Sequence, residues 1–414
     1  MSQQEPLPED IAGSKILLLE GISEKAVRHF ETLGFRHVVR ETKALQGDDL
    51  VAALKDVRIL GIRSRSQVDD AILARAEMLR VVGCFSVGTN QIDLDAAQRR
   101  GIPVFNAPFS NTRSVAELTI AEAVMLLRRA FARSMAAHAG RWDKSAAGSY
   151  ELRGKTLGII GYGNIGTQLA VLAEAMGMRV VYFDHTDKLR HGNVEPMESL
   201  DALLATSDIV SLHVPETPQT KDMIGAAEIA KMKKGAYLIN NARGTVVDLD
   251  ALAKALREEH LAGAAVDVFP VEPKSNADSF ESPLRGLENV ILTPHVGGST
   301  LEAQERIGDE VSRKLSEYAN NGSTVGAVNF PQVQLPPRTD VTRFIQVQRN
   351  LPGELRKLND IFADRDVNIA AQHYQTKGEI GYVVLDAEGT VDDADSIVAA
   401  IKTLPGTLRA RVLR

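Results

Sequence analysis

Residues 161–166, Gly161-Tyr-Gly163-Asn-Ile-Gly166, decide the fold of this chain because of what stands on either side of them. The run before them, KTLGII at 155–160, is apolar and β-branched toward its end, which predicts a short buried strand. The run IGTQLAVLAEAM at 165–176 has the apolar spacing of a helix and stops at a glycine. A strand that turns through glycines into a helix is therefore the predicted centre of an α/β domain.

The three glycines have distinct physical uses in such a turn. Gly161 allows the tight turn, Gly163 lets the backbone approach a pyrophosphate, and Gly166 lets the helix pack on the strand. The free N–H groups and the positive dipole end of the helix N-terminus favour phosphate. A lone G-x-G-x-x-G motif is weak support and is compatible with an ordinary glycine-rich turn, but the flanking elements favour a dinucleotide site.

The choice of cofactor depends on the acid that follows. A second predicted strand, RVVYF at 179–183, ends in Asp184, which stands 18 residues after Gly166. A carboxylate at this position can accept hydrogen bonds from the ribose hydroxyls of NAD and repels the additional phosphate of NADP. The alternative is a solvated aspartate at a strand end, and Lys188 and Arg190 lie close enough to keep NADP open. NAD is the favoured cofactor.

Composition places the chain among ordinary globular proteins. Its 414 residues are enough for two or three domains, and 44% of them are hydrophobic and 25% charged. The net charge of −6 gives no indication of nucleic acid or an anionic membrane as a partner. No stretch approaches the roughly 20 apolar residues of a membrane helix. The single cysteine, Cys84, excludes an intrachain disulfide and favours a reducing, cytoplasmic location.

Apolar runs before and after the glycine motif outline two α/β parts. Residues 15–108 alternate short strands with helical stretches in a parallel α/β pattern of their own. A long helix over 114–140 is predicted to begin at a capping box of Ser114 and Glu117, and its broad apolar surface suits a subunit interface. The alternation of strands and helices then resumes and predicts a doubly wound Rossmann-type sheet of about six strands.

The last part of the chain has a different pattern. After a predicted helix over 300–319, the proline-rich run FPQVQLPPRTD at 330–340 predicts a linker. The remaining residues follow the order strand, helix, strand, strand, helix, strand. This βαββαβ order predicts a ferredoxin-like domain.

Three residues near the dinucleotide motif have the chemistry of a hydride-transfer site. Arg243, Glu272 and His295 each follow a predicted parallel strand, at the sheet edge where ligands bind. A histidine suits proton transfer near neutral pH, a carboxylate can fix its tautomer, and a guanidinium can hold a substrate carboxylate. Each residue alone has an ordinary structural interpretation, and their shared placement favours the functional one.

A second basic pair is Arg63 and Arg65, at the end of the predicted strand RILGIRS. Residues i and i+2 of a strand point to one face, so both guanidinium groups are expected to point the same way. Such a fork matches a phosphate or a dicarboxylate. A solvated basic face explains the spacing equally well.

Long phrases of this sequence are specific enough to identify a resemblance. From 15 to 330 the chain resembles the D-isomer-specific 2-hydroxyacid dehydrogenases, and within them the bacterial members that carry a C-terminal ACT domain. The phrases that carry it include GCFSVGTNQIDLDAAQRRGIPVFNAPFSNTRSVAEL, VSLHVPETPQTKDMIG, ARGTVVDLDALAKAL, GAAVDVFPVEP and TPHVGGSTLEAQERIG.

The resemblance implies a domain plan in which the NAD-binding Rossmann domain is inserted into a flavodoxin-like substrate domain. The substrate-binding domain would comprise 1–110 with 299–335, the NAD-binding domain 111–298, and the ACT regulatory domain 339–414. The helix after Ser299 would return to pack with residues 15–108. The family dimerises through the domain that carries the long helix, and ACT domains pair edge to edge, which implies a homotetramer.

The resemblance also implies a reaction and a set of site residues. The reaction is NAD-dependent oxidation of D-3-phosphoglycerate to 3-phosphohydroxypyruvate, the first step of L-serine biosynthesis, with 2-oxoglutarate reduction as a side activity. Arg243 would orient the substrate, Glu272 would support the base, and His295 would transfer the proton; no metal is implied. The implied cofactor contacts are Gly161, Gly163, Asn164, Ile165, Gly166, Asp184, His213, Val214, Pro215, Asn241, Ala242, Arg243, Asp267, His295, Val296, Gly297 and Gly298. The implied substrate contacts are Arg63, Arg65 and Asn111, with Lys43 and Lys144 as further basic residues near the cleft, from this or a neighbouring subunit.

Two departures from the family pattern concern regulation by L-serine, the implied effector. The effector site would comprise Gln348, Asn350 and Asn368, but the family has a histidine where Gln348 stands, and glutamine cannot become charged. The Gly-Gly hinge often found in this group is absent, and Asp340-Val341 stands near its place. Two other functions stay open at this point: a different D-2-hydroxyacid dehydrogenase, such as a glyoxylate or hydroxypyruvate reductase, and an NAD-sensing interaction protein on the same fold.

Overall fold

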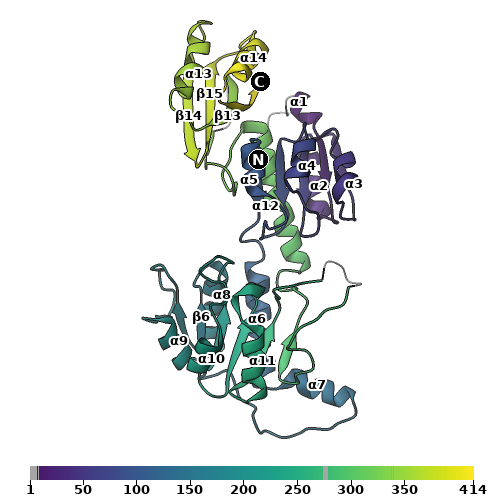
Figure 1. Cartoon of the computed structure of the whole chain (residues 1–414), viewed down its shortest axis with the longest axis vertical. Helices are drawn as coiled ribbons and strands as arrows, with labels where there is room; N and C mark the ends of the chain where they lie inside the picture. The colour runs from purple at the N-terminus through teal and green to yellow at the C-terminus, as the bar shows by residue number, and fades with distance from the viewer. Residues whose placement is uncertain (1–6, 8, 274–277, 337, 339) are drawn as a thin grey trace. The chain divides into compact units, whose positions relative to one another are not determined.

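A computed structural model describes residues 7, 9–273, 278–336, 338 and 340–414 of the chain. These residues form two compact units, Met1–Ser110 with Gln304–Arg414, and Asn111–Ala303 (Figure 1). The second unit is therefore an insertion in the sequence of the first. No described helix combines the length and the apolarity that crossing a bilayer requires.

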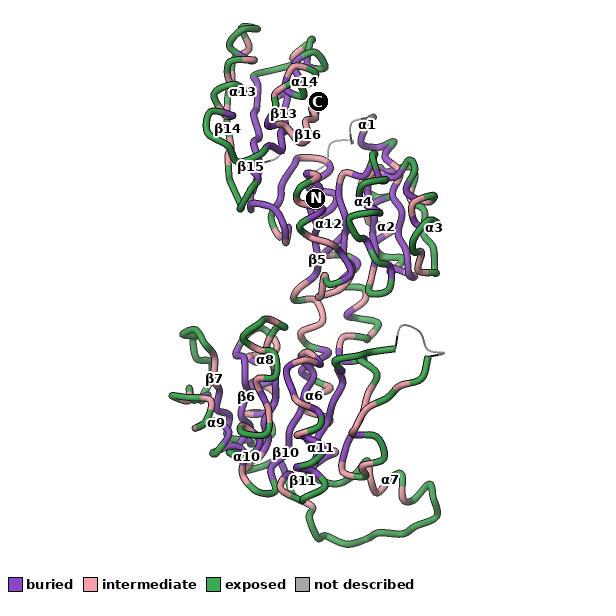
Figure 2. Tube along the Cα trace, in the orientation of Figure 1, coloured by how far each residue is buried: buried purple, intermediate pink, exposed green. Residues whose placement is uncertain are grey.

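The first unit contains a parallel five-stranded sheet of order β2-β1-β3-β4-β5. Four of its strands are almost wholly buried, and the helices between them cover the sheet (Figure 2). The strands are β1 (Lys15–Leu18), β2 (His37–Arg40), β3 (Val57–Ile62), β4 (Val81–Cys84) and β5 (Val104–Asn106). The helices are α1 (Glu9–Ala12), α2 (Glu24–Thr32), α3 (Gly47–Ala53), α4 (Asp70–Arg75) and α5 (Leu94–Arg99). The predicted α/β pattern of this part is confirmed.

Residues from beyond the insertion complete the core of this first sheet. The helix α12 (Leu301–Asn321) contributes Ile307, Val311 and Leu315 to the same buried cluster as Phe105. Asn329 then accepts a hydrogen bond from Val104 N at 2.8 Å and donates one to Ile102 O at 2.9 Å. The core of this five-stranded sheet therefore depends on side chains that stand more than 190 residues after its last strand in the sequence.

The second unit contains a parallel seven-stranded sheet of order β12-β11-β10-β9-β6-β7-β8. Its strands are β6 (Thr156–Ile160), β7 (Arg179–Phe183), β8 (Glu195–Pro196), β9 (Ile209–Leu212), β10 (Ala236–Asn240), β11 (Leu261–Val266) and β12 (Val290–Leu292). The helices are α6 (Thr112–Leu127), α7 (Ala130–His138), α8 (Asn164–Ala175), α9 (Leu200–Thr206), α10 (Ala226–Lys231) and α11 (Leu249–Arg257). The doubly wound fold is confirmed, with a two-residue edge strand beyond the predicted six. Strand order reverses at β6, so ligands are expected beside its carboxyl end.

The predicted long helix over 114–140 is wrong in two respects. It breaks into α6 and α7 because Arg129 between them adopts a left-handed conformation, with φ of 49°. The capping box is also absent, because α6 begins at Thr112 and the Ser114 side chain is already inside the helix. Its hydroxyl shares a 2.8 Å hydrogen bond with that of Thr300, and Glu117 pairs with Arg113.

The C-terminal residues of the first unit form the predicted βαββαβ fold, with an antiparallel sheet of order β14-β15-β13-β16. Its elements are β13 (Val341–Arg349), α13 (Glu354–Ala363), β14 (Ile369–Lys377), β15 (Ile380–Glu388), α14 (Ala394–Thr403) and β16 (Thr407–Leu413). The predicted linker before it packs against the unit, since Phe330, Val333 and Leu335 are buried. Pro337 and Thr339 of that linker lie outside the described residues.

Side chains of this antiparallel sheet satisfy backbone carbonyls at the end of α12. Arg343, fully buried, forms a two-pronged ion pair with Asp386 at 2.6 Å and donates to Asn321 O at 2.9 Å. Tyr382 donates its hydroxyl to Gly322 O at 2.6 Å. Arg411 donates to Tyr318 O at 2.6 Å. The last carbonyls of a helix lack intrahelical partners, so these contacts fix the sheet to α12.

Candidate functional site

The glycine turn has the geometry that a dinucleotide needs. Gly161 has φ of 93°, and a Cβ there would lie 2.6 Å from His213 O. A Cβ on Gly166 would lie 2.4 Å from Gly161 O, so the helix start could not pack as closely with a larger residue. In contrast, a Cβ on Gly163, directly before α8, meets nothing within 4 Å. The helix N-terminus therefore opens onto free space at Gly163, where a phosphate can approach the backbone.

Asp184 follows β7 and closes this turn. Its carboxylate accepts a hydrogen bond from Tyr162 N at 2.9 Å and two from Thr186, from N and Oγ1, at 3.0 Å. The Asp184 side chain is only 7% exposed, and Lys188 lies 3.9 Å away. A carboxylate can accept about four hydrogen bonds, so capacity for a ribose hydroxyl remains.

The other implied cofactor residues follow the neighbouring strands of the same sheet. His213, Val214 and Pro215 follow β9, and Asn241 and Ala242 follow β10. Burial lowers the pKa of His213 to about 3, so its ring is neutral, and Nε2 hydrogen-bonds the Ser211 hydroxyl at 2.9 Å. Together with the turn at 161–166, these residues line the edge at which strand order reverses.

Asp267, after β11, holds the loop that carries His295. Its carboxylate accepts hydrogen bonds from Thr293 Oγ1 at 2.6 Å and from the backbone N–H groups of Val296 and Gly297, both at 2.8 Å. Its carbonyl accepts one from His295 N at 2.8 Å. His295 itself has φ of 54°, an uncommon conformation for a residue with a side chain. The hydrogen bonds of Asp267 stabilise that conformation.

His295 and Glu272 are brought together by this loop. His295 Nδ1 lies 2.9 and 3.0 Å from the two Glu272 oxygens, and Glu272 also accepts from Phe269 N at 3.1 Å. The hydrogen bond from His295 to Glu272 raises the pKa of His295, although burial opposes it. With Nδ1 donating to the carboxylate, Nε2 is the nitrogen that can exchange a proton with a substrate.

Arg243 lies just after β10, half-buried, and donates to Ala242 O at 2.6 Å. Burial lowers the pKa of Arg243, and attraction to Glu216 and Glu272 partly offsets that effect. An arginine stays charged in proteins, so this unit places a cation near the Glu272 and His295 pair. The three strand-end residues therefore lie near enough to interact electrostatically.

Sequence reasoning missed Glu122, a fully buried acid on α6. Asn241 Nδ2 donates to Glu122 Oε2 at 2.7 Å and to Thr119 Oγ1 at 3.0 Å. Burial raises the pKa of Glu122 to about 8, so it is protonated at neutral pH. The partner stands 119 residues away in sequence, and no local pattern indicates it. These hydrogen bonds fix Asn241, which stands two residues before Arg243 in the sequence, to α6.

The strand argument for Arg63 and Arg65 is wrong, although both residues lie close together. Strand β3 ends at Ile62, and 63–66 form a turn whose N–H groups face the carboxylate of Glu20. Arg63 is half-buried, and Arg65 is 54% exposed with Nε 3.8 Å from Glu20 Oε2. The two guanidinium groups are thus presented by a turn, whose geometry depends on Glu20.

The remaining implied substrate residues are spread over both units. Lys43 lies in the first unit with Arg63 and Arg65, and Lys144 is exposed in the second. Asn111 lies in the second unit directly before α6, and its Oδ1 is buried without a hydrogen-bond partner. A Cβ on Gly298 would lie 2.5 Å from Asn111 Nδ2, so Gly298 allows this side chain to reach the loop of His295.

The implied effector residues are not gathered within one chain. Gln348 is fully buried in β13, and both polar atoms of its side chain lack partners. Asn350 follows β13 and donates to Gly378 O at 3.2 Å, whereas Asn368 precedes β14 beside Glu388. Asn350 lies beside the first residue of β15 and Asn368 beside its last. The nine residues of β15 therefore separate the two asparagines by roughly 30 Å.

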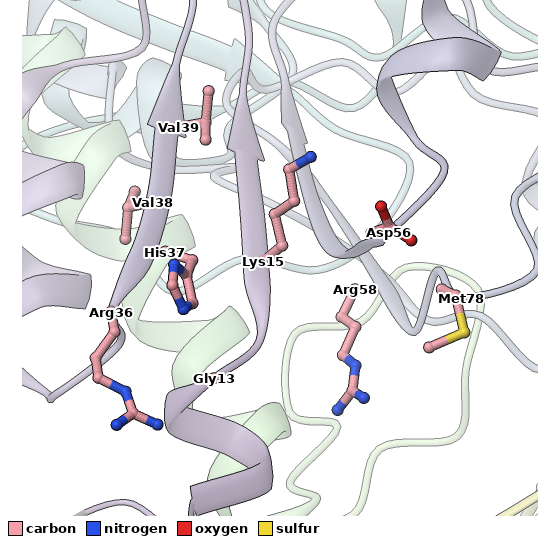
Figure 3. Close-up of a pocket in the computed structure, with 9 residues that line it drawn as sticks. All are labelled: Gly13, Lys15, Arg36, His37, Val38, Val39, Asp56, Arg58 and Met78. Atoms are coloured by element: carbon pink, nitrogen blue, oxygen red, sulfur yellow. The ribbon is translucent and has the colours of Figure 1, made fainter.

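A hollow of about 590 Å³ lies at the opposite edge of the first sheet, where its strands begin (Figure 3). Lys15, His37 and Arg58 line it from neighbouring strands, with Arg36 and Asp56 beside them. Helices in a parallel α/β unit end at this edge, and basic side chains there stabilise their C-terminal carbonyl groups. Ligands bind at the other edge of such sheets, so this hollow is separate from the candidate site.

Comparisons with known proteins agree with this geometry. Residues 120–297 match the NAD-binding domain of D-isomer specific 2-hydroxyacid dehydrogenases, and 344–409 match an ACT domain like that of the AHAS small subunit. The chain is 53% identical to D-3-phosphoglycerate dehydrogenase of Escherichia coli K12, over 96% of this chain and 97% of that protein. It is 52% identical to the Haemophilus influenzae protein of the same name, with the same coverage. Among solved structures, D-lactate dehydrogenase of Aquifex aeolicus, complexed with NAD and lactic acid, matches with a TM-score of 0.67 and 29% identity, over 77% of this chain and 100% of that one.

Proposed function

This chain belongs to the D-isomer-specific 2-hydroxyacid dehydrogenases, in the group of the D-3-phosphoglycerate dehydrogenases, and from that premise we propose its reaction and the residues that perform it. The reaction is the NAD-dependent oxidation of D-3-phosphoglycerate to 3-phosphohydroxypyruvate, which opens L-serine biosynthesis. The observation that supports it best is the pair of His295 and Glu272, 2.9 Å apart, in the unit that carries the NAD turn.

His295 is the base of the proposed mechanism. Its Nε2 accepts the proton of the substrate C2 hydroxyl, and Glu272 stabilises the imidazolium that results. Arg243 holds the substrate carboxylate and polarises the C2 oxygen. In the reverse direction the same imidazolium returns the proton to the carbonyl oxygen.

The second unit fits NAD. Bound NAD supplies the acceptor for the hydride that leaves C2. The open backbone at Gly163 would hold the pyrophosphate, and Asp184 would hold the ribose of the adenosine half. The residues at 213–215, 241–243, 267 and 295–298 would surround the rest of the cofactor.

The proposed phosphate readers are Arg63 and Arg65 in the first unit. Two guanidinium groups on one turn match a phosphate monoester. The proposed further substrate contacts are Asn111, Lys43 and Lys144. Arg63 and Arg65 would favour the proposed substrate over unphosphorylated 2-hydroxy acids, which have no phosphate for the two guanidinium groups to bind.

Turnover assays test this function. With NADH, we expect reduction of 3-phosphohydroxypyruvate at a kcat/KM far above that for hydroxypyruvate or glyoxylate, and slower reduction of 2-oxoglutarate. Arg63→Ala or Arg65→Ala should raise KM for the phosphorylated substrate at least about tenfold and leave the unphosphorylated one nearly unchanged. Equal activity on all substrates would contradict the phosphate assignment, and no turnover would favour an NAD-sensing role.

We also propose that L-serine regulates the enzyme and that the active form is a cytoplasmic homotetramer. Within one chain Asn350 and Asn368 lie at opposite ends of the antiparallel sheet, so a shared serine site requires a second ACT domain. A homotetramer needs a second surface at which subunits pair. The helix α7 supports such a surface, because none of its residues is buried and Phe131 and Met135 are exposed. The proposed domain boundaries are 1–110 with 299–335, 111–298 and 339–414.

A further inference from the structure

We propose that Glu20 is a positioning residue that sets phosphate specificity, because its buried carboxylate holds the Arg63–Arg65 turn in the form that presents both guanidinium groups. This inference rests on the proposed function, in which those arginines bind the substrate phosphate. Glu20 follows β1, and its own φ is 62°.

One carboxylate accepts four consecutive backbone hydrogen bonds. Glu20 Oε1 accepts from Arg63 N at 3.2 Å and Ser66 N at 2.9 Å. Oε2 accepts from Ser64 N at 3.0 Å and Arg65 N at 2.9 Å. All four lone-pair sites of the carboxylate are therefore occupied, and every N–H of the turn points away from solvent. Of the side chains of the turn, Ser64 and Arg65 are exposed, Ser66 is buried, and Arg63 is half-buried with Nη1 donating to Glu20 O at 3.4 Å.

The carbonyl side of the turn is fixed as well. Arg63 O accepts a hydrogen bond from Gln91 Nε2, and Arg65 O accepts one from Gln46 Nε2 at 3.2 Å. Both peptide faces of the two arginines thus have partners in the fold. Of these partners, only Glu20 contacts all four residues of the turn.

Glu20 also connects this turn to the loop of Lys43. Its backbone N–H donates to Lys43 O at 3.1 Å, and the next residue, Gly21, donates to Glu41 O at 2.9 Å. The same short segment therefore binds both loops that carry the proposed basic contacts. A change at Glu20 should affect the spacing of Arg63 and Arg65 first and the loop of Lys43 second.

The electrostatics of this arrangement favour a structural anion over a bound one. The Glu20 side chain is 1% exposed. Burial alone would raise the pKa of Glu20, but hydrogen bonds from Ser66, Arg65 and Arg63 outweigh it and hold the pKa below its ordinary value. Consecutive N–H groups that converge in this way form an anion site. Here the protein's own carboxylate occupies it, so a substrate phosphate meets the arginine side chains and not the backbone.

The deciding variant is Glu20→Gln, assayed in the full-length enzyme. Glutamine has nearly the same shape but only one acceptor oxygen, and its NH₂ group would face backbone donors. The quantity to measure is the ratio of kcat/KM for 3-phosphohydroxypyruvate to that for hydroxypyruvate. We expect this ratio to fall at least about tenfold, through a raised KM for the phosphorylated substrate, with kcat nearly unchanged. Because both substrates are assayed on one sample, the ratio does not depend on the fraction of folded enzyme.

Two further variants separate positioning from general stability. Glu20→Asp keeps the charge but shortens the reach, so its ratio should lie between those of wild type and Glu20→Gln; if the glutamine variant yields no active enzyme, this variant decides. Glu354→Gln alters another carboxyl that is 3% exposed, on α13, and should leave the ratio unchanged. A wild-type ratio in the Glu20 variants, or an equal fall in Glu354→Gln, would overturn the proposal.

Variants of Arg63 and Arg65 distinguish a failure of the Glu20 proposal from a failure of the proposed phosphate binding. If Arg63→Ala and Arg65→Ala lower the ratio and the Glu20 variants do not, only the role of Glu20 fails. If the arginine variants leave the ratio unchanged, the phosphate assignment fails and the role of Glu20 fails with it. A purely structural glutamate would lower activity on both substrates by the same factor.

Discussion

His295 and Glu272 form the contact on which the proposed chemistry depends. We expect His295→Asn to lower kcat at least about 100-fold with little change in NADH binding, because asparagine cannot take up a proton. Glu272→Gln should lower the pKa of His295, since the hydrogen bond to Glu272 is what raises it. Because oxidation needs neutral His295, the acid limb of the pH–rate profile of Glu272→Gln should move to lower pH. Near wild-type turnover in His295→Asn, or an unmoved limb in Glu272→Gln, would contradict these roles.

Glu122 makes stability depend on pH. Its pKa is raised from an ordinary value of 4.5 to about 8, chiefly by burial. Between these values the folded chain keeps a proton that the unfolded chain loses, so the free energy of unfolding falls as pH rises. Glu122→Gln should remove this slope, and the difference between variant and wild type should grow by at most about 5 kcal/mol from pH 4.5 to 8. Urea unfolding at a series of pH values measures it, with Glu117→Gln on the exposed face of α6 as the control. Parallel curves for Glu122→Gln and wild type would refute it.

At the residue scale, the meeting of Glu272 and His295 could be predicted from local order. Glu272 and His295 follow strands in the sequence, and the shared edge of a parallel sheet brings them together. Glu20 and Glu122 could not be found in this way, because their partners stand 43 and 119 residues away and their environment is created by folding. The supposed capping box failed for a related reason: Ser114 hydrogen-bonds Thr300, which the sequence places 186 residues later.

At the level of elements, apolar runs predicted nearly every strand, because parallel strands are buried on both faces. The break between α6 and α7 was not predictable from composition, since the residues there are Arg128 and Arg129 and not glycine or proline. The left-handed conformation of Arg129 is a tertiary effect: Tyr150 N donates to Leu127 O at 2.9 Å, directly before the turn.

The break leaves α7 as a helix without buried residues, and this predicts an interface. Phe131 and Met135 are 38% and 58% exposed, and Trp142, the only tryptophan of the chain, is 87% exposed. We expect Trp142 fluorescence to be blue-shifted in the assembled enzyme and to shift to the red on dilution. Met135→Glu should give smaller species in sedimentation, whereas Met78→Glu, at another exposed methionine, should not. Equal sedimentation of Met135→Glu and wild type would exclude α7 from the interface.

For the whole molecule, the attachment of the ACT domain bears on regulation. Instead of a glycine hinge, Arg343, Tyr382 and Arg411 bind the carbonyl end of α12. Inhibition needs two arrangements that differ in serine affinity, typically by about 1–3 kcal/mol of coupling, and these contacts oppose a change of arrangement. We expect serine to bind but to inhibit weakly or with little cooperativity.

Calorimetry and initial rates across a serine titration measure binding and inhibition separately. Asn350→Ala should abolish the heat of binding. Arg343→Met removes the contact from β13 to Asn321 O of α12, together with the ion pair to Asp386 inside the sheet, and should strengthen the response in the folded variant. No heat and no change in rate up to millimolar serine would contradict the regulatory proposal. The ACT domain would then serve assembly or another ligand.

The inserted second unit has a consequence for how the chain is made. On a ribosome, β1 to β5 emerge first, but their sheet lacks α12 and Asn329 until more than 190 further residues have been synthesised. The second unit is continuous in sequence and can fold while the first unit is still incomplete and exposes apolar surface. We therefore expect the nascent first unit to be the stage most prone to aggregation, and a chain that stops before residue 329 to aggregate even though all five strands of its sheet are present.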